Sequence, residues 1–191
     1  MQIRRNILLA LAILLTLCSC ASGQKTERQT LSEIYSNILG YHDWGIPIIY
    51  CLHYDLNMHI GSTTYTDPSW TNSKWIWAAD ELPGLEQETW ENFVQVTSEP
   101  AAFPSDLKLG CRYTLRAEEN ADPYPPGKGH WDIDFSQVGF NKNRDQALAY
   151  FMRMWSGTAT SIGGGYGTLY LLELKNGIWT VTGELVTLYI N

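Results

Sequence analysis

The hydrophobic pattern predicts two helices in the first half of the chain. Between residues 30 and 39, apolar side chains recur at the spacing of one helix face, and Thr30 and Glu33 fit a capping box at its start. A second helix is predicted over residues 80–96, where the following side chains share one face: Leu85, Thr89, Trp90, Phe93 and Val94. We expect each helix to bury one face against a sheet.

The second half of the chain has the pattern of long strands. Asn176-Gly177 suits a two-residue type I′ hairpin, and this register sets Leu174 opposite Trp179 and Leu172 opposite Val181. The expected strands are one or two within 47–66, one over 130–140 with a bulge near Ser136-Gln137, then 147–155, 168–175 and 178–190. The glycine-rich stretch 163–167 is expected to be a flexible hairpin connection.

Helices followed by a run of strands predict an α+β fold. We expect an N-terminal helix and a second helix packed on a curled antiparallel sheet with a C-terminal β-meander. Residues 30–191 are long enough for one domain with a single sizeable core. The polar, small residues 20–29 are expected to be a tether that precedes this domain.

The first residues contain the parts of a secretory signal. Arg4 and Arg5 precede an apolar run over residues 7–17, and small residues follow it. This run is shorter than the roughly 20 apolar residues that a membrane-spanning helix needs. Residues 1–19 are therefore predicted to be a signal peptide that exports the chain.

The stretch Leu17-Cys18-Ser19-Cys20 resembles the lipobox of bacterial lipoproteins. The resemblance implies cleavage before Cys20 and acylation of its thiol, so that a lipid anchor holds the chain to a membrane. Ala21 is not the Asp that retains lipoproteins in the inner membrane, which favours the periplasmic face of the outer membrane in a host with two membranes. The alternative is ordinary cleavage after Gly23, which gives a free periplasmic protein.

Either cleavage leaves Cys51 and Cys111 as a pair of thiols in an oxidising compartment. One disulfide between them is expected, and two separate buried thiols are the alternative. The formal net charge of the whole chain is −7. Such an acidic chain repels phosphate backbones, so nucleic acid is excluded as an expected partner.

Three polar residues alternate on the predicted strand that begins at His130. Together with Asp132 and Asp134, this histidine is a candidate metal or acid–base site. Positions i and i+2 of a strand are about 6.7 Å apart, so at most two of the three side chains reach one metal ion. A solvated polar face is the favoured interpretation.

Two further groups of residues are weaker candidates, one for a metal site and one for a phosphate-binding loop. His53, Asp55 and His59 lie near Cys51, but they lack a recognised metal-ligand spacing. The run Gly163–Gly167 has no Lys-Ser/Thr ending and leads into a strand, so it does not fit a phosphate-binding loop. No catalytic residue, metal site or cofactor is predicted.

The densest group of aromatic residues is Trp70, Trp75 and Trp77, with Tyr65 nearby. Exposed indole rings stack on sugars or dock against proteins, because they give a large contact area for a small loss of entropy. Rings of this size are more often part of a core. The three tryptophans are nevertheless the candidate binding residues.

A resemblance to a bacterial family covers the last third of the chain. The residues that carry it are Ser136-x-Val138-Gly139-Phe140-Asn141, Ala147-Leu148, Gly165-Tyr166-Gly167 and Asn176-Gly177-x-Trp179. This pattern resembles a module of uncharacterised secreted bacterial proteins and lipoproteins. The resemblance implies a fold and an exported location, and it implies no reaction.

These observations predict an envelope lipoprotein with a non-catalytic domain that binds a protein or a glycan. The prediction depends on the tryptophan group and on the lack of a catalytic motif such as Gly-x-Ser-x-Gly. The alternative is a small envelope hydrolase or metal-dependent enzyme that uses His130, Asp132 or Asp134.

Overall fold

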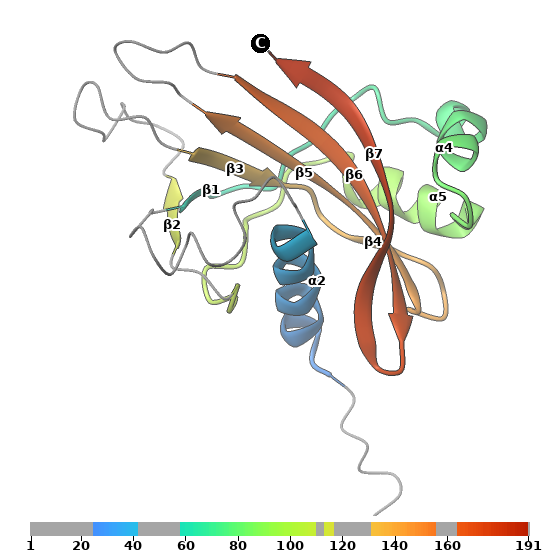
Figure 1. Cartoon of the computed structure of the whole chain (residues 1–191), viewed down its shortest axis with the longest axis horizontal. Coiled ribbons are helices and arrows are strands. Elements are labelled where there is room, and N and C mark those ends of the chain that lie inside the picture. Colours follow the sequence, from blue (N-terminus) through green and yellow to red (C-terminus); the bar gives the residue numbers. More distant parts are fainter. Residues whose placement is uncertain (1–24, 42–57, 110–112, 117–130, 156–163, 191) are drawn as a thin grey trace, which may run out of the picture. The chain divides into compact units, whose positions relative to one another are not determined.

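The computed structural model describes residues 25–41, 58–109, 113–116, 131–155 and 164–190 (Figure 1). The chain divides into two compact units, residues 1–30 and 31–191, and each unit is considered by itself. The sheet, the candidate site and the helices that cover the sheet belong to residues 31–191, apart from residues 27–30 at the start of the first helix.

Helix α2 (Glu27–Tyr41) begins one turn earlier than predicted. The Thr26 N–H donates to Gln29 Oε1 (2.9 Å), and the Gln29 N–H donates to Thr26 Oγ1 (3.3 Å), which together form a capping box. The box predicted at Thr30 is therefore wrong, and the helix includes the end of the predicted tether. Glu33 Oε1 instead accepts a hydrogen bond from the backbone of the last strand (2.9 Å).

The second predicted helix is two helices. A short 3₁₀ helix, η1 (Asn72–Lys74), leads into α4 (Trp75–Glu81), and α5 (Gln87–Val96) follows after a sharp break. The break lies at Pro83-Gly84, where the glycine has a φ of +92° that no other residue adopts easily. This local signal divides a segment whose apolar pattern alone predicts one continuous helix.

The sheet is mixed rather than antiparallel throughout, and it is not strongly curled. The α+β class and the C-terminal antiparallel meander are confirmed. Among the described residues, the strand order is β2-β1-β3-β5-β6-β7, and β4 pairs with β5 (Figure 1). Strand β1 runs parallel to β2 and β3. The strands are β1 (Met58–Gly61), β2 (Tyr113–Arg116), β3 (Trp131–Phe135), β4 (Gly139–Phe140), β5 (Gln146–Trp155), β6 (Gly164–Lys175) and β7 (Ile178–Ile190).

The β6–β7 hairpin has the predicted register. Asn176 and Gly177 both have positive φ, 53° and 79°, and Leu174 pairs with Trp179 as expected. Two other expectations are wrong. The predicted bulged strand over 130–140 is interrupted between β3 and β4, and β6 begins within the glycine-rich stretch instead of after it.

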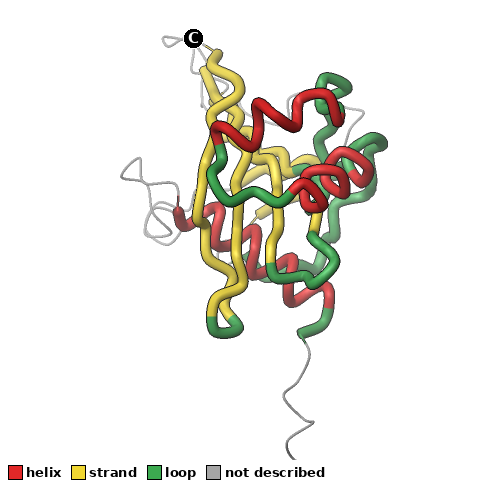
Figure 2. The backbone as a smooth tube through the Cα atoms, turned by 90° about the vertical axis from the view of Figure 1, so that its right-hand side faces the viewer, coloured by secondary structure: helices red, strands yellow, loops and turns green. Residues whose placement is uncertain are grey.

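Helices cover both faces of the sheet. One face of β5 and β6, which includes Phe151 and Leu172, packs against Ile34 and Ile38 of α2. Side chains of the opposite face contact the α4–α5 segment in a second cluster: Leu148, Tyr150, Leu169, Leu171, Leu82, Trp90 and Phe93. Figure 2 looks onto the side of the molecule where α4 and α5 lie. Because both faces are buried, the sequences of β5 and β6 are apolar almost without alternation.

Candidate functional site

Ser136 joins the sheet to α2. Its side chain donates to the Gln137 carbonyl (2.7 Å) and accepts the Tyr150 N–H (2.8 Å). Its own carbonyl accepts the hydroxyl of Tyr35 (2.9 Å). All its polar groups are engaged inside the core, so this serine has a structural role and is not available as a nucleophile.

Asn141 and Gln146 hold the loop before β5 against the start of α5. Asn141 Nδ2 donates to Glu86 Oε2 (2.9 Å) and to Asp145 Oδ1 (2.6 Å). Gln146 Oε1 accepts the Glu86 N–H and the Thr89 hydroxyl, both at 2.8 Å. These are buried polar groups whose partners are protein atoms, as a stable core requires. Asn141, which belongs to the resemblance pattern, thus positions α5.

The glycines of β6 allow neighbouring groups to approach closely. A Cβ at Gly167 would overlap the hydroxyl of Tyr150, and a Cβ at Gly165 would overlap the Arg153 carbonyl. This packing accounts for glycine at both positions. The stretch is therefore the beginning of a strand in close contact with β5.

The two phenols at the centre of the α4–α5 face are Tyr65 and Tyr150. Their rings stack with centroids 4.9 Å apart. Burial raises the pKa of the Tyr150 hydroxyl to about 12. Burial, with the nearby carboxylates of Asp67 and Asp134, also raises the pKa of Tyr65. Both phenols stay protonated at neutral pH, which does not suit a general base or a nucleophile.

The polar sets predicted from sequence are only partly described. Asp132 and Asp134 lie on β3 and are partly buried, and His59 pairs with Asp132 in the parallel register of β1 and β3. His130, His53 and Asp55 lie outside the described residues. Within the described part of the chain, no three His, Cys, Asp or Glu residues are grouped so that they could hold a metal ion.

The cysteines of the predictions also lie outside the described residues. These are Cys20, the predicted lipidation site, and the predicted disulfide pair Cys51 and Cys111. Among the helices that the structure describes, none is both long enough and apolar enough to cross a membrane.

Trp70 is part of the core. Only 7% of its surface is exposed, and its ring centroid lies 4.8 Å from those of Phe93 and Tyr150. Tyr65 contacts it edge-on at 5.8 Å. Trp70 therefore fits the alternative of a core residue and not the predicted binding role, because its ring is not accessible to a ligand.

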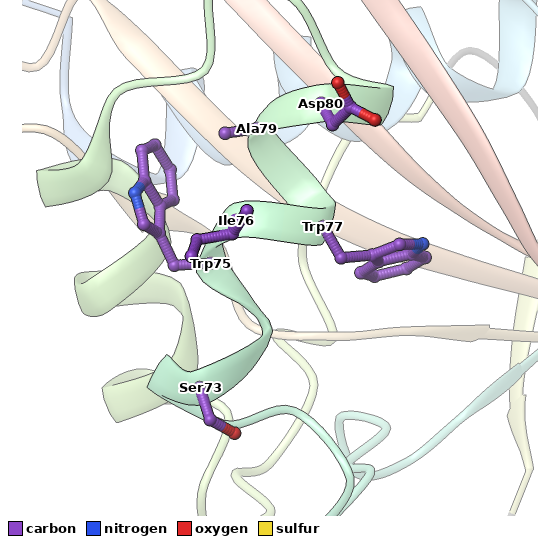
Figure 3. A pocket seen from close by; sticks show the side chains of 6 residues that line it. All are labelled: Ser73, Trp75, Ile76, Trp77, Ala79 and Asp80. Atoms are coloured by element: carbon purple, nitrogen blue, oxygen red, sulfur yellow. The ribbon is translucent and has the colours of Figure 1, made fainter.

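Trp75 and Trp77 project to opposite sides of α4 (Figure 3). A separation of two residues turns a helix by about 200°, so both rings cannot share one face. Trp75 packs partly buried against the core cluster below the helix, whereas 40% of Trp77 is exposed. Ile76, between them, is 80% exposed, the highest value among the exposed large apolar residues of the described chain.

Ile76 and Trp77 together form what we call the α4 patch. It borders an open depression on the surface of the helix, which is also lined by Trp75, Ala79 and the polar residues Ser73 and Asp80 (Figure 3). Lys74 Nζ lies 6.0 Å from the centroid of the Trp77 ring, within reach of a cation–π interaction. The sequence singled out Trp77 but missed Ile76. The Pro83-Gly84 break, which allows a separate short helix before it, is the signal that could have found it.

Comparison of the chain with protein-family models, with curated proteins and with solved structures found no match.

Proposed function

We propose that this chain is a lipid-anchored protein of the bacterial cell envelope whose domain is a non-catalytic binding module for a protein or a glycan. The observation that carries the binding role is the α4 patch. Monomeric proteins keep most large apolar side chains covered, and adjacent exposed ones are typical of contact surfaces. Ile76 and Trp77 are adjacent, both exposed and held on a helix whose other side is packed on the core.

The buried polar groups around the start of β5 support a binding module rather than an enzyme. Ser136, Asn141 and Gln146 spend their hydrogen-bonding atoms on other parts of the fold. Tyr65 and Tyr150 are held in the protonated form by burial. None of these five residues is left poised for acid–base or nucleophilic chemistry.

The envelope location depends on the arginine-led leader and on Cys20. We expect Cys20→Ser to move the protein from the membrane fraction to the soluble periplasmic fraction, because the acyl chains are then missing. Fractionation followed by immunoblotting measures the shift. In the same exported protein, mass analysis after thiol alkylation should find Cys51 and Cys111 unmodified and joined. Unchanged membrane retention of the variant, or an unprocessed chain in the cytosol, would contradict the proposed location.

The binding role predicts a complex that depends on the α4 patch. The full chain, extracted in mild detergent from its own envelope, should elute on gel filtration at a mass well above that of its monomer. Ile76→Ser with Trp77→Ser should shift most of it to the monomer position, because the central apolar anchors of an interface carry most of its binding energy.

The control is Ile178→Ser, which changes a residue that is 60% exposed at the β6–β7 turn. Both variants should stay folded, and Ile178→Ser should keep the free energy of urea unfolding within about 0.5 kcal/mol of the parent, as expected for an exposed position. A monomeric parent protein, or a complex that both variants leave intact, would rule out the α4 patch as the binding surface.

A further inference from the structure

The α4 patch has an apolar centre and a charged border. Ile76 and Trp77 are followed one helical turn later by Asp80 and Glu81, and both of these carboxylates are exposed. Ser73 lies one turn before Ile76, and Lys74, the only Lys or Arg within η1 and α4, donates to Ser69 Oγ (3.2 Å). Two acids thus border the apolar pair on one side.

A sugar ring fits this surface poorly. Of the six residues that line the depression, only Ser73 and Asp80 carry side-chain oxygens. Glycans are held by several placed polar groups in addition to a stacked ring. Ile76, the most exposed large apolar residue of the described chain, offers no hydrogen bond and no flat ring face.

A bilayer also fits poorly. Asp80 lies about one helical turn from Ile76, a rise of roughly 5 to 6 Å along the axis. Insertion deep enough to bury the Ile76 side chain would bring this carboxylate toward the hydrocarbon, where ionised acids are disfavoured. The apolar pair is also too small to offset that penalty by itself.

A protein surface with an apolar cleft suits both the apolar centre and the charged border of the α4 patch. Ile76 and Trp77 project from α4 as anchors, and a polar rim around such anchors is the usual composition of a protein–protein interface. Asp80 and Glu81 are negative, and the whole chain has a formal charge of −7, so basic groups at the edge of such a cleft would complement them.

We infer that the α4 patch binds a partner protein that presents an apolar cleft bordered by Lys or Arg side chains. This inference rests on the proposed binding function and narrows its partner class. It assigns Asp80 and Glu81 to the rim of the interface and Ile76 and Trp77 to its centre.

The test is photo-crosslinking in living cells with p-benzoyl-phenylalanine in place of Ser73, which lines the depression without belonging to the patch. We expect one discrete adduct of the full chain on a denaturing gel, unchanged by muramidase digestion. In this reporter chain, Ile76→Ser and Trp77→Ser should each reduce the adduct at least tenfold.

Charge reversal tests the basic border of the cleft. Asp80→Lys with Glu81→Lys should reduce the adduct at least tenfold. The matched controls Glu173→Lys and Ile178→Ser should leave it unchanged, because the β6–β7 turn lies far from α4 (Figures 1 and 2).

Each other outcome overturns the inference. An adduct that muramidase collapses to the monomer identifies a glycan, and one with lipid mass identifies a bilayer. If a discrete adduct persists in Ile76→Ser and Trp77→Ser, the α4 patch is not the binding surface. If it persists after charge reversal, the cleft of the partner has no basic border. A glycan adduct would leave the proposed binding function standing, whereas no adduct together with a monomeric extract would remove both.

Discussion

Raising the pH above about 10 should destabilise this protein steeply. The unfolded chain ionises tyrosines that burial keeps protonated in the folded protein, so a rise in pH favours the unfolded state. Three hydroxyls on the two core faces belong to fully buried rings: Tyr35, Tyr150 and Tyr170. Burial raises the pKa of all three, for Tyr150 to about 12. Neighbouring Tyr166 and Glu184 add to the effect at Tyr170.

The sign follows from which state binds more protons. Below about pH 10 both states keep these protons, so the contribution to stability is complete; above it, only the folded state keeps them. Each tyrosine then lowers the free energy of unfolding by about 1.4 kcal/mol per pH unit, and three together by about 4 kcal/mol. For a domain at the lower end of typical stability, about 5 kcal/mol, between one and two pH units above 10 would exhaust it.

Urea unfolding at a series of pH values between 8.5 and 11.5, on the order of one measurement per half unit, checks this slope. Tyr35→Phe should lose some stability at neutral pH, because Ser136 no longer receives its hydroxyl hydrogen bond. It should also reduce the slope of the free energy of unfolding against pH, above about pH 10, by about a third. A purely structural effect would leave that slope unchanged. A free energy of unfolding that stays level up to pH 11 would contradict the burial of these phenols.

Gly139→Ala should destabilise the domain by about 3 kcal/mol, at the upper end of the range for inserting one carbon into a packed core. A Cβ at this position would overlap the backbone of Phe93 in α5, and backbone atoms cannot rotate away as a side chain can. The helix would have to move off β4, which strains the hydrogen bond from the Phe140 N–H to Asn92 Oδ1 (2.7 Å).

Gly183→Ala is the matched control. Its Cβ would meet the end of the Leu82 side chain at 3.2 Å and the Leu171 Cβ at 3.5 Å, so a small side-chain adjustment accommodates it. We expect a cost of about 1 kcal/mol or less, measured as the shift of the urea midpoint. Equal costs for the two substitutions would mean that α5 is not seated on β4 as described.

Local patterns predicted the elements that depend on neighbours in sequence. The helix face with Ile34 and Ile38, the face with Trp90 and Phe93, and the Asn176-Gly177 hairpin with its register all follow from spacing and turn chemistry. The α4–α5 break was also local, since Pro83-Gly84 is an explicit stop signal, but a continuous apolar face outweighed it in the prediction.

The parallel pairs of β1 could not be predicted in this way. Strands far apart in sequence form them, and no pattern within Met58–Gly61 distinguishes a parallel neighbour from an antiparallel one. Gly139 and Gly167 are similar cases. The sequence placed Gly139 in a strand and Gly167 in a hairpin connection, and only the approach of Phe93 and Tyr150 shows why a side chain is excluded at each.

Sequence alone determined the α+β class and the concentration of tryptophan between residues 70 and 77, because these depend on composition and short-range periodicity. The export signal also follows from short-range pattern, and it stays a prediction. Only the tertiary structure decided the role of each indole ring. Trp70 and Trp77 have the same chemistry, yet the first lies on Phe93 and Tyr150 and the second faces solvent. The physical reason is that exposure depends on what packs against a residue from distant segments, and residues close in the chain do not encode it.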